Sequence, residues 1–225
     1  MFFASGNVYD GEWEDGVRNG CGESNYANKD RYVGTFKSDK KHGEGTYTYK
    51  NGNVYMGGWN MDSREGKGTY TFVNGEYYNG DYVANKRVGY AKYKNANGES
   101  YEGQYENGKR CGQGTYIYNS GARYVGGWKD DKKVGKGKYT FPDGENYDGD
   151  YKDGVRDGHG VYYYKNGDVY DGPWVSDNRH GKADYTFANG NKKIGEFENG
   201  NFKKWLEDKK EDDDKKDDDK KDEEK

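Results

Sequence analysis

A strict period of 23 residues constrains this chain more than any other feature of its sequence. From Tyr9 onward the chain divides without insertion into eight equal blocks, and a truncated ninth block begins at Lys193. Position 3 of each block is glycine, position 5 is aromatic, and position 12 is glycine in every complete block. A fixed period of this length indicates a repeat array in which each unit packs only on its neighbours.

Each block contains two stretches with the alternation of a β-strand, illustrated by residues 32–36 and 45–49. Position 8, between them, is always Gly, Asp or Asn, which tolerate positive φ, and Asn-Gly or Asp-Gly pairs recur between blocks. Because every connection is short, consecutive strands must pair antiparallel. The predicted fold class is all-β: a single-layer, elongated antiparallel β-meander.

Strand parity places positions 1, 3, 5, 14, 16 and 18 on one side of the predicted sheet. Of the 25 tyrosines, 22 fall at positions 1, 5, 16 or 18. Leucine occurs once and isoleucine twice, so an aliphatic core is not available. Glycines at positions 3 and 14 allow the sheet to bend and leave slots over which rings can lie. We therefore expect the sheet to curl into an aromatic groove.

The repeat divides the chain into four segments. Residues 1–8 read as the closing half of an N-terminal partial repeat, and residues 9–192 as eight complete repeats. Residues 193–206 are predicted to be a partial repeat and a capping segment, with a helix as one form of the cap and Trp205 over the last aromatic layer. Residues 207–225 are predicted to be a disordered charged tail, because residues 208–225 hold 11 acidic and 7 lysine residues and nothing apolar.

Composition and the start of the chain favour a protein of the cytoplasm. No apolar stretch approaches the length of a membrane span, and the first residues lack the pattern of a secretory signal. Cys21 and Cys111 are far apart in the sequence, which favours free thiols in a reducing compartment.

Catalysis and metal binding find little support in the sequence. The histidines occupy turn positions, and His42 and His180 lie six repeats apart, so they cannot share a site. The stretch 148–154 resembles a calcium loop only faintly, since Lys152 stands where an oxygen ligand is needed. The prediction is a non-enzymatic protein with no catalytic residue, metal site or cofactor.

Two surfaces are candidate binding sites. Position 10 is Lys or Arg in all eight repeats, which predicts a basic edge whose central members are Arg64, Arg87, Arg110, Lys133 and Arg156. Three interpretations of this edge stay open: a solvated edge with local charge compensation, a site for an acidic protein, or a site for anionic lipid. The aromatic groove is expected to leave part of its rings exposed as partner contacts, with these central rings: Trp59, Tyr82, Tyr105 and Trp128. Nucleic-acid binding is not expected, because the array carries no net positive charge.

The stretch 101–116, YEGQYENGKRCGQGTY, resembles the MORN repeat, and the resemblance covers residues 9–192. In the second half, residues 120–126 (SGARYVG), 141–144 (FPDG) and 157–164 (DGHGVYYY) look like the radial spoke head 1 proteins of motile cilia. This resemblance implies a non-catalytic scaffold of the ciliary axoneme that binds other radial spoke head subunits, with a homodimer as a further option. The alternative function is a membrane-associated adaptor that binds acidic phospholipids through the basic edge.

Overall fold

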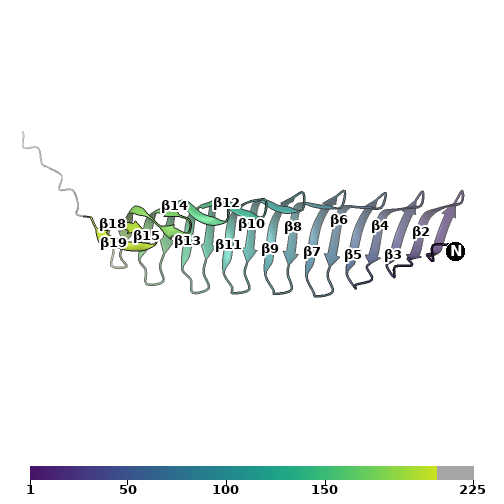
Figure 1. Ribbon diagram of the computed structural model, residues 1–225, viewed down its shortest axis with the longest axis horizontal. Helices are drawn as coiled ribbons and strands as arrows, with labels where there is room; N and C mark the ends of the chain where they lie inside the picture. The colour runs from purple at the N-terminus through teal and green to yellow at the C-terminus, as the bar shows by residue number, and fades with distance from the viewer. Residues whose placement is uncertain (207–225) are drawn as a thin grey trace, which may run out of the picture.

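Residues 1–206, the part of the chain that the computed structural model describes, form one sheet of 19 strands without a helix (Figure 1). The strands lie side by side along the long axis of the molecule, and the N-terminus lies at one end of it. The predicted all-β meander is therefore confirmed. The predicted tail, 207–225, lies outside the described residues.

The strands are short and similar in length from one repeat to the next. They are β1 (Val8–Glu14), β2 (Val17–Asn25), β3 (Arg31–Lys37), β4 (Lys40–Thr48), β5 (Val54–Asn60), β6 (Ser63–Thr71), β7 (Tyr77–Val83), β8 (Lys86–Lys94), β9 (Ser100–Glu106), β10 (Lys109–Ile117), β11 (Arg123–Lys129), β12 (Lys132–Thr140), β13 (Asn146–Lys152), β14 (Val155–Tyr163), β15 (Val169–Val175), β16 (Asn178–Arg179), β17 (Gly181–Thr186), β18 (Lys192–Glu198) and β19 (Asn201–Trp205).

Each strand pairs antiparallel with the next strand in the chain, so the sheet order follows the sequence order. The pairing continues in the same way through the second half. One interruption occurs at His180, where β15 pairs with both β16 and β17. No connection crosses the sheet, because every turn joins adjacent strands.

The turn inside each repeat needs two successive residues in the left-handed region. Ser38 and Asp39 have φ of 47° and 65°, and Asp130 and Asp131 have φ of 48° and 69°. This is the pattern of a two-residue turn whose twist suits a β-hairpin. The restriction of position 8 to Gly, Asp and Asn follows from it.

A register shift bends the first hairpin of each repeat. In the second repeat the shift falls between Gly34 and Phe36 of β3, opposite Gly43 of β4, which has φ of 67°. An irregularity of this kind kinks one strand and increases its twist. The invariant glycine at position 12 is therefore the backbone position that bends the sheet, in addition to the glycines at positions 3 and 14.

The core is a continuous line of aromatic rings on one side of the sheet. The tyrosine at position 1 of every repeat is at most 1% exposed. The Tyr32 ring packs edge-to-face on Phe36 of its own repeat and on Trp59 of the next repeat, at centroid distances of 5.1 and 5.6 Å. The same contacts recur down the array, so each repeat is held mainly by its neighbours.

Glycine makes room for this core. The Tyr32 hydroxyl donates to the Thr35 carbonyl at 3.0 Å, and its ring lies against backbone from two facing strands. A Cβ at Gly34 or Gly45 would lie 2.5 or 2.3 Å from the Tyr32 oxygen. The predicted ring slots at positions 3 and 14 are therefore present, although position 14 is alanine in two repeats.

The C-terminal cap is a hairpin, and the helical form that the sequence left open does not occur. Residues 192–205 form β18 and β19, which pair with each other. The Trp205 ring contacts Tyr185, Phe187 and Phe202 at centroid distances of 5.6, 5.3 and 4.5 Å. A strand satisfies the open edge of β18 with backbone hydrogen bonds, which a helix at this place could not do.

Candidate functional site

The four groove rings predicted as partner contacts are almost fully buried. Trp59, Tyr82, Tyr105 and Trp128 are 6, 2, 6 and 5% exposed. The expectation that these four are among the exposed rings of the groove is wrong, because the neighbouring position-1 tyrosines and position-10 side chains cover them. A role of these rings in binding stays a prediction, and in this structure their observed role is to form the core.

The rings at positions 16 and 18 form the accessible part of the aromatic face. They are half-buried and pack against the core, as Tyr47, Tyr49 and Tyr70 do. Most position-16 tyrosines donate to a carboxylate of the preceding repeat, for example Tyr93 to Glu76 and Tyr116 to Glu99, both at 2.7 Å. Burial, together with the Glu76 bond, raises the pKa of Tyr93 to about 12. These hydroxyls are therefore neutral and act as fixed donors.

The position-10 cations lie on the aromatic face and not at an outer edge. Each is paired directly across from the position-5 ring, as Arg87 is across from Tyr82. The Arg110 guanidinium carbon lies 4.4 Å from the centroid of the Trp128 ring of the next repeat. This stacking is a cation–π contact that also covers the ring. The basic edge predicted from the sequence is thus a half-buried row along the groove.

Most of these cations are tied to the turn of the following repeat. The Arg110 backbone N–H and Nε both donate to Asp131 Oδ1 at 3.0 Å, and Nη2 donates to the Asp131 carbonyl at 3.1 Å. Arg156 binds Asp177 in the same way. Arg18 and Lys41 pair with Asp39 and Asp62, respectively. Position 8 therefore supplies a carboxylate to the cation of the preceding repeat.

This row of ion pairs is broken in the middle of the array. Arg64 meets the neutral amide of Asn85, at 3.4 Å between Nε and Oδ1. The residue that would pair with Arg87 is Gly108, which has no side chain to accept from it. Within residues 1–206 the Arg87 guanidinium lies over the rings of Tyr78 and Tyr105 and makes no salt bridge.

A second break lies further along, where Gly154 leaves Lys133 with the rings of Tyr124, Tyr139 and Tyr151. Burial lowers the pKa of Lys133. The local charge compensation considered for the basic edge is therefore present at some repeats and missing at others.

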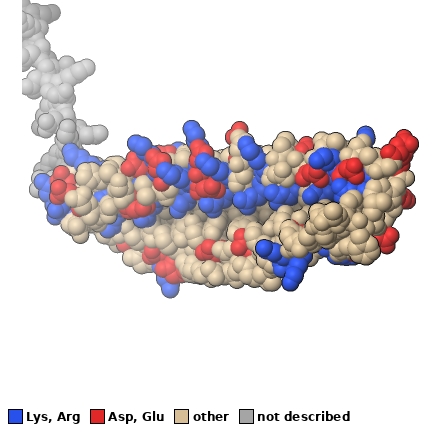
Figure 2. Space-filling view, turned by 45° about the vertical axis from the view of Figure 1, so that its right-hand side comes forward, with Lys and Arg blue, Asp and Glu red and all other residues tan. Residues whose placement is uncertain are grey.

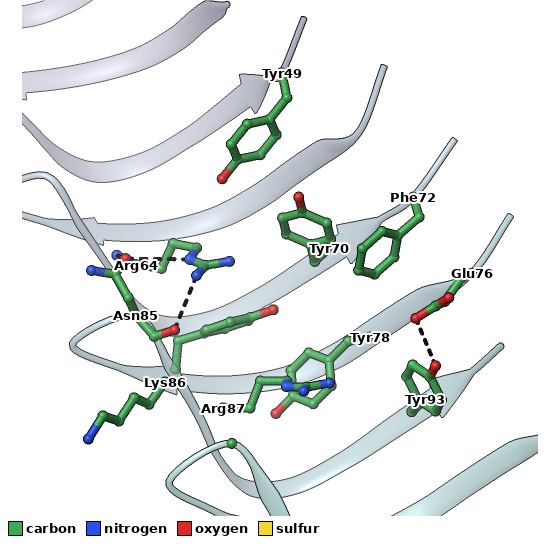
Figure 3. Close-up of a pocket in the computed structure, with 12 residues that line it drawn as sticks. Tyr49, Arg64, Tyr70, Phe72, Glu76, Tyr78, Asn85, Lys86, Arg87 and Tyr93 are labelled. Carbon is green, nitrogen blue, oxygen red and sulfur yellow. Dashed lines mark hydrogen bonds between the residues drawn. The ribbon is translucent and has the colours of Figure 1, made fainter. Parts of the chain in front are cut away.

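A hollow of about 560 Å³ opens on the groove beside the first break (Figure 3). Its residues come from the third and fourth repeats and their neighbours: Tyr49, Arg64, Tyr70, Phe72, Glu76, Tyr78, Tyr82, Asn85, Lys86, Arg87, Tyr93 and Gly108. Figure 2 shows Lys and Arg side chains gathered along one side of the hollowed face. This recess joins aromatic surface to positive charge.

The sequence pattern of the MORN repeat matches eight successive segments of the chain. They are residues 9–31, 32–54, 55–77, 78–100, 101–123, 124–145, 147–169 and 170–192. The chain belongs to the MORN repeat family. The matched segments coincide with the eight 23-residue blocks of the sequence, except that the sixth match ends one residue before its block does. The comparison with curated proteins found no match.

Solved structures share only a distant likeness with this MORN array. The TCP10c domain of Drosophila melanogaster Sas-4 is 16% identical, covering 69% of this chain and 93% of that one, with a TM-score of 0.40. The Sas-4 TCP domain in complex with a proline-rich motif of Ana2 is 13% identical over 84% and 88%, with a TM-score of 0.39. The TCP10 domain of Danio rerio CPAP is 10% identical over 92% and 98%, with a TM-score of 0.31.

The residues considered for catalysis stay apart in the MORN array. His159 faces Asp171 at 3.2 Å, and Cys21 and Cys111 are free thiols. Within residues 1–206, no three His, Cys, Asp or Glu side chains are grouped so that they could hold a metal ion. The same residues include no helix of the length and apolarity that crossing a membrane requires.

Two features of the groove were missed at the sequence level. The sequence pattern predicts the Asp at position 8 as a turn residue that compensates charge within its own turn, whereas in the structure it pairs with the cation of the preceding repeat. The acid at position 22, which accepts from the position-16 tyrosine of the next repeat, is not predicted at all. A comparison of position 8 in one repeat with position 10 in the preceding one would have indicated the ion pairs. The signal was obscured because the two positions are 21 residues apart in the chain, as in Arg110 and Asp131.

Proposed function

We propose that this MORN protein is a non-catalytic scaffold that binds protein partners along its groove, and that it works in the radial spoke head of the ciliary axoneme. The observation that carries the scaffold role is the groove itself. Cations and half-buried rings repeat along one face at a spacing of roughly 10 Å, the width of two strands. A surface of this kind offers many similar weak contacts in a line, which suits a long partner segment.

The axonemal placement rests on the resemblance of residues 120–126, 141–144 and 157–164 to radial spoke head 1 proteins. Under this proposal the protein is cytoplasmic, localises to the cilium and binds other spoke head subunits. A homodimer would double the mass measured by light scattering and would be compatible with the same role.

The test is to tag the protein in a ciliated cell, extract isolated cilia with detergent and identify the proteins that co-purify by mass spectrometry. Retention in the axoneme together with spoke head subunits is the expected result. Absence from cilia, or partners that are all unrelated to the spoke, would contradict the axonemal assignment while leaving the scaffold role open.

The alternative is a membrane-associated adaptor that binds acidic phospholipids, and the cations without a carboxylate partner favour it. The half-buried position of Arg87 disfavours it, because a flat membrane surface does not enter a recess. Flotation with phosphatidylserine vesicles separates the two functions. Release with the detergent-soluble membrane fraction, together with flotation, would establish the adaptor instead.

A further inference from the structure

The row of ion pairs is broken at two places in the groove, and at the first of them unpaired positive charge lines the hollow. Within residues 1–206, three cations line the hollow, Arg64, Lys86 and Arg87, and one carboxylate, Glu76. That carboxylate already accepts the hydroxyl of Tyr93 at 2.7 Å. The two arginines lie on adjacent repeats, so their charges face the same recess (Figure 3).

The equivalent cations elsewhere show what the recess lacks. Arg110 and Arg156 each hold a carboxylate oxygen at 3.0 Å from Nε. Asn85 and Gly108 stand where the repeats that follow Arg110 and Arg156 have aspartate, so that position supplies no carboxylate to Arg64 or Arg87. Arg64 donates instead to the neutral Asn85, from Nε to the side-chain oxygen at 3.4 Å and from Nη2 to the carbonyl at 3.2 Å. A half-buried guanidinium that stacks on rings is partly desolvated, and an anion that enters beside it forms a charge-assisted bond.

We propose that this hollow is a binding subsite for an extended acidic protein segment, whose carboxylates take the place of the missing aspartates at Arg64 and Arg87. The half-buried rings of Tyr49, Tyr70 and Phe72 form the apolar wall of the same recess. The segment therefore carries Asp or Glu beside apolar side chains. This inference rests on the proposed scaffold function and names the chemistry of its partner.

A protein segment fits this recess better than a membrane does. The guanidiniums are held over the rings of Tyr55, Tyr78, Tyr82 and Tyr105, at 5.1 to 5.6 Å from their centroids. They are therefore drawn in toward the sheet and do not extend outward. A single side chain can reach them, whereas a planar array of lipid headgroups cannot follow them into the hollow.

The chain offers a substitution that closes the subsite without removing a cation. Asp at position 8 has φ between 65° and 72° in four repeats, and Gly108 has φ of 86°. A Cβ on Gly108 would meet nothing within 4 Å. The variant Gly108→Asp should therefore fold and provide Arg87 with its own carboxylate. Gly16→Asp is the matched control, because it adds the same residue at the same turn position, and residues 1–8, which precede that repeat, contain no Lys or Arg to pair with it.

The experiment measures binding of a short fluorescent peptide that alternates glutamate with phenylalanine, by anisotropy, with a glutamine version as the neutral probe. We expect the wild-type chain to bind the glutamate peptide about tenfold more tightly than the glutamine peptide. Gly108→Asp should weaken glutamate-peptide binding by about the same factor, Asn85→Asp should act in the same direction, and Gly16→Asp should leave binding unchanged. Thermal unfolding of each variant shows that the array is intact.

Three results would overturn the subsite. They are equal binding by Gly108→Asp and the wild type, equal binding of the two peptides, and Arg87-dependent binding of phosphatidylserine vesicles in the absence of peptide binding. The scaffold function is tested separately, by co-purification from cilia. If spoke head subunits co-purify equally with the wild type and with Gly108→Asp, that result supports the scaffold function and contradicts the acidic subsite.

Discussion

At the scale of single residues, the repeat is governed by how closely tyrosine can approach the backbone. The position-1 ring lies on glycine backbone from two strands, and its hydroxyl donates to a carbonyl three residues later, as Tyr124 does to Gly127 at 3.0 Å. A buried hydroxyl of this kind needs its acceptor. Burial raises the pKa of the Tyr124 hydroxyl well above its ordinary value, so it stays a donor.

Gly34→Ala should destabilise the array by about 1–3 kcal/mol. A Cβ there would lie 2.5 Å from the Gly45 Cα and 2.6 Å from the Glu44 carbonyl oxygen, and backbone atoms cannot move aside easily. Thermal unfolding followed by circular dichroism checks this. Gly45→Ala is the control and should cost less, because Ala91 and Ala183 occupy the same position in two other repeats. An equal loss in both variants would argue against the close-approach explanation.

At the scale of the elements, consecutive hairpins are tied together at their turns in two ways. The N–H of position 8 donates to the carbonyl of position 10 in the preceding repeat, as Gly108 does to Arg87 at 2.9 Å. Where position 8 is aspartate, its carboxylate adds a second contact, an ion pair with the position-10 cation of the preceding repeat. The backbone bond does not depend on the side chain, which explains why glycine is accepted at this position.

Exchanging residues at position 8 should change stability in opposite directions. Asp131→Gly removes the partner of Arg110 and should lower stability by about 0.5–1 kcal/mol, while Gly154→Asp should raise it by a similar amount by pairing with Lys133. The expected measure is the shift in the thermal midpoint of each single variant. High salt should reduce both shifts, since the pairs are partly exposed. Shifts of the same sign would contradict the role assigned to the carboxylate.

At the scale of the whole molecule, each repeat contacts only its neighbours, and carboxylates take part in many of the contacts between repeats. Hydrogen bonds from the Arg18 backbone and side chain lower the pKa of Asp39. Hydrogen bonds from Tyr116 and Tyr185 lower the pKa of Glu99 and Asp168, respectively. Since the folded pKa lies below the unfolded one, each group adds stability above the unfolded pKa and loses it as the pH falls through the folded pKa.

The stability of the array should therefore decrease as the pH falls below about 4.5. Thermal midpoints measured from neutral pH down to about 3 should decline steadily. Asp39→Asn should be less stable at neutral pH and should lose less on acidification, since one of the groups that titrate is gone. A midpoint that stays constant, or rises, toward pH 3 would show that these carboxylates do not join the repeats.

The local pattern alone determined the fold of this protein. Alternation, turn dipeptides and the fixed period are short-range properties, and a meander joins only strands that are adjacent in the chain, so no long-range choice was needed. The sequence likewise determined which face is aromatic, because side-chain parity in a strand is local.

Only the tertiary structure decided which groove residues are covered and which cations are paired. The rings of Trp59 and Trp128 are covered by rings and cations of the preceding repeats. Their burial therefore arises only when the repeats stack. The register shift at position 12 brings position 10 directly across from the position-5 ring, and stacking of the hairpins places it beside position 8 of the next repeat. Within residues 1–206, Arg110 has a carboxylate partner and Arg87 lies over rings without one. The difference depends on one side chain 21 residues further along, and that proximity arises only when the hairpins stack.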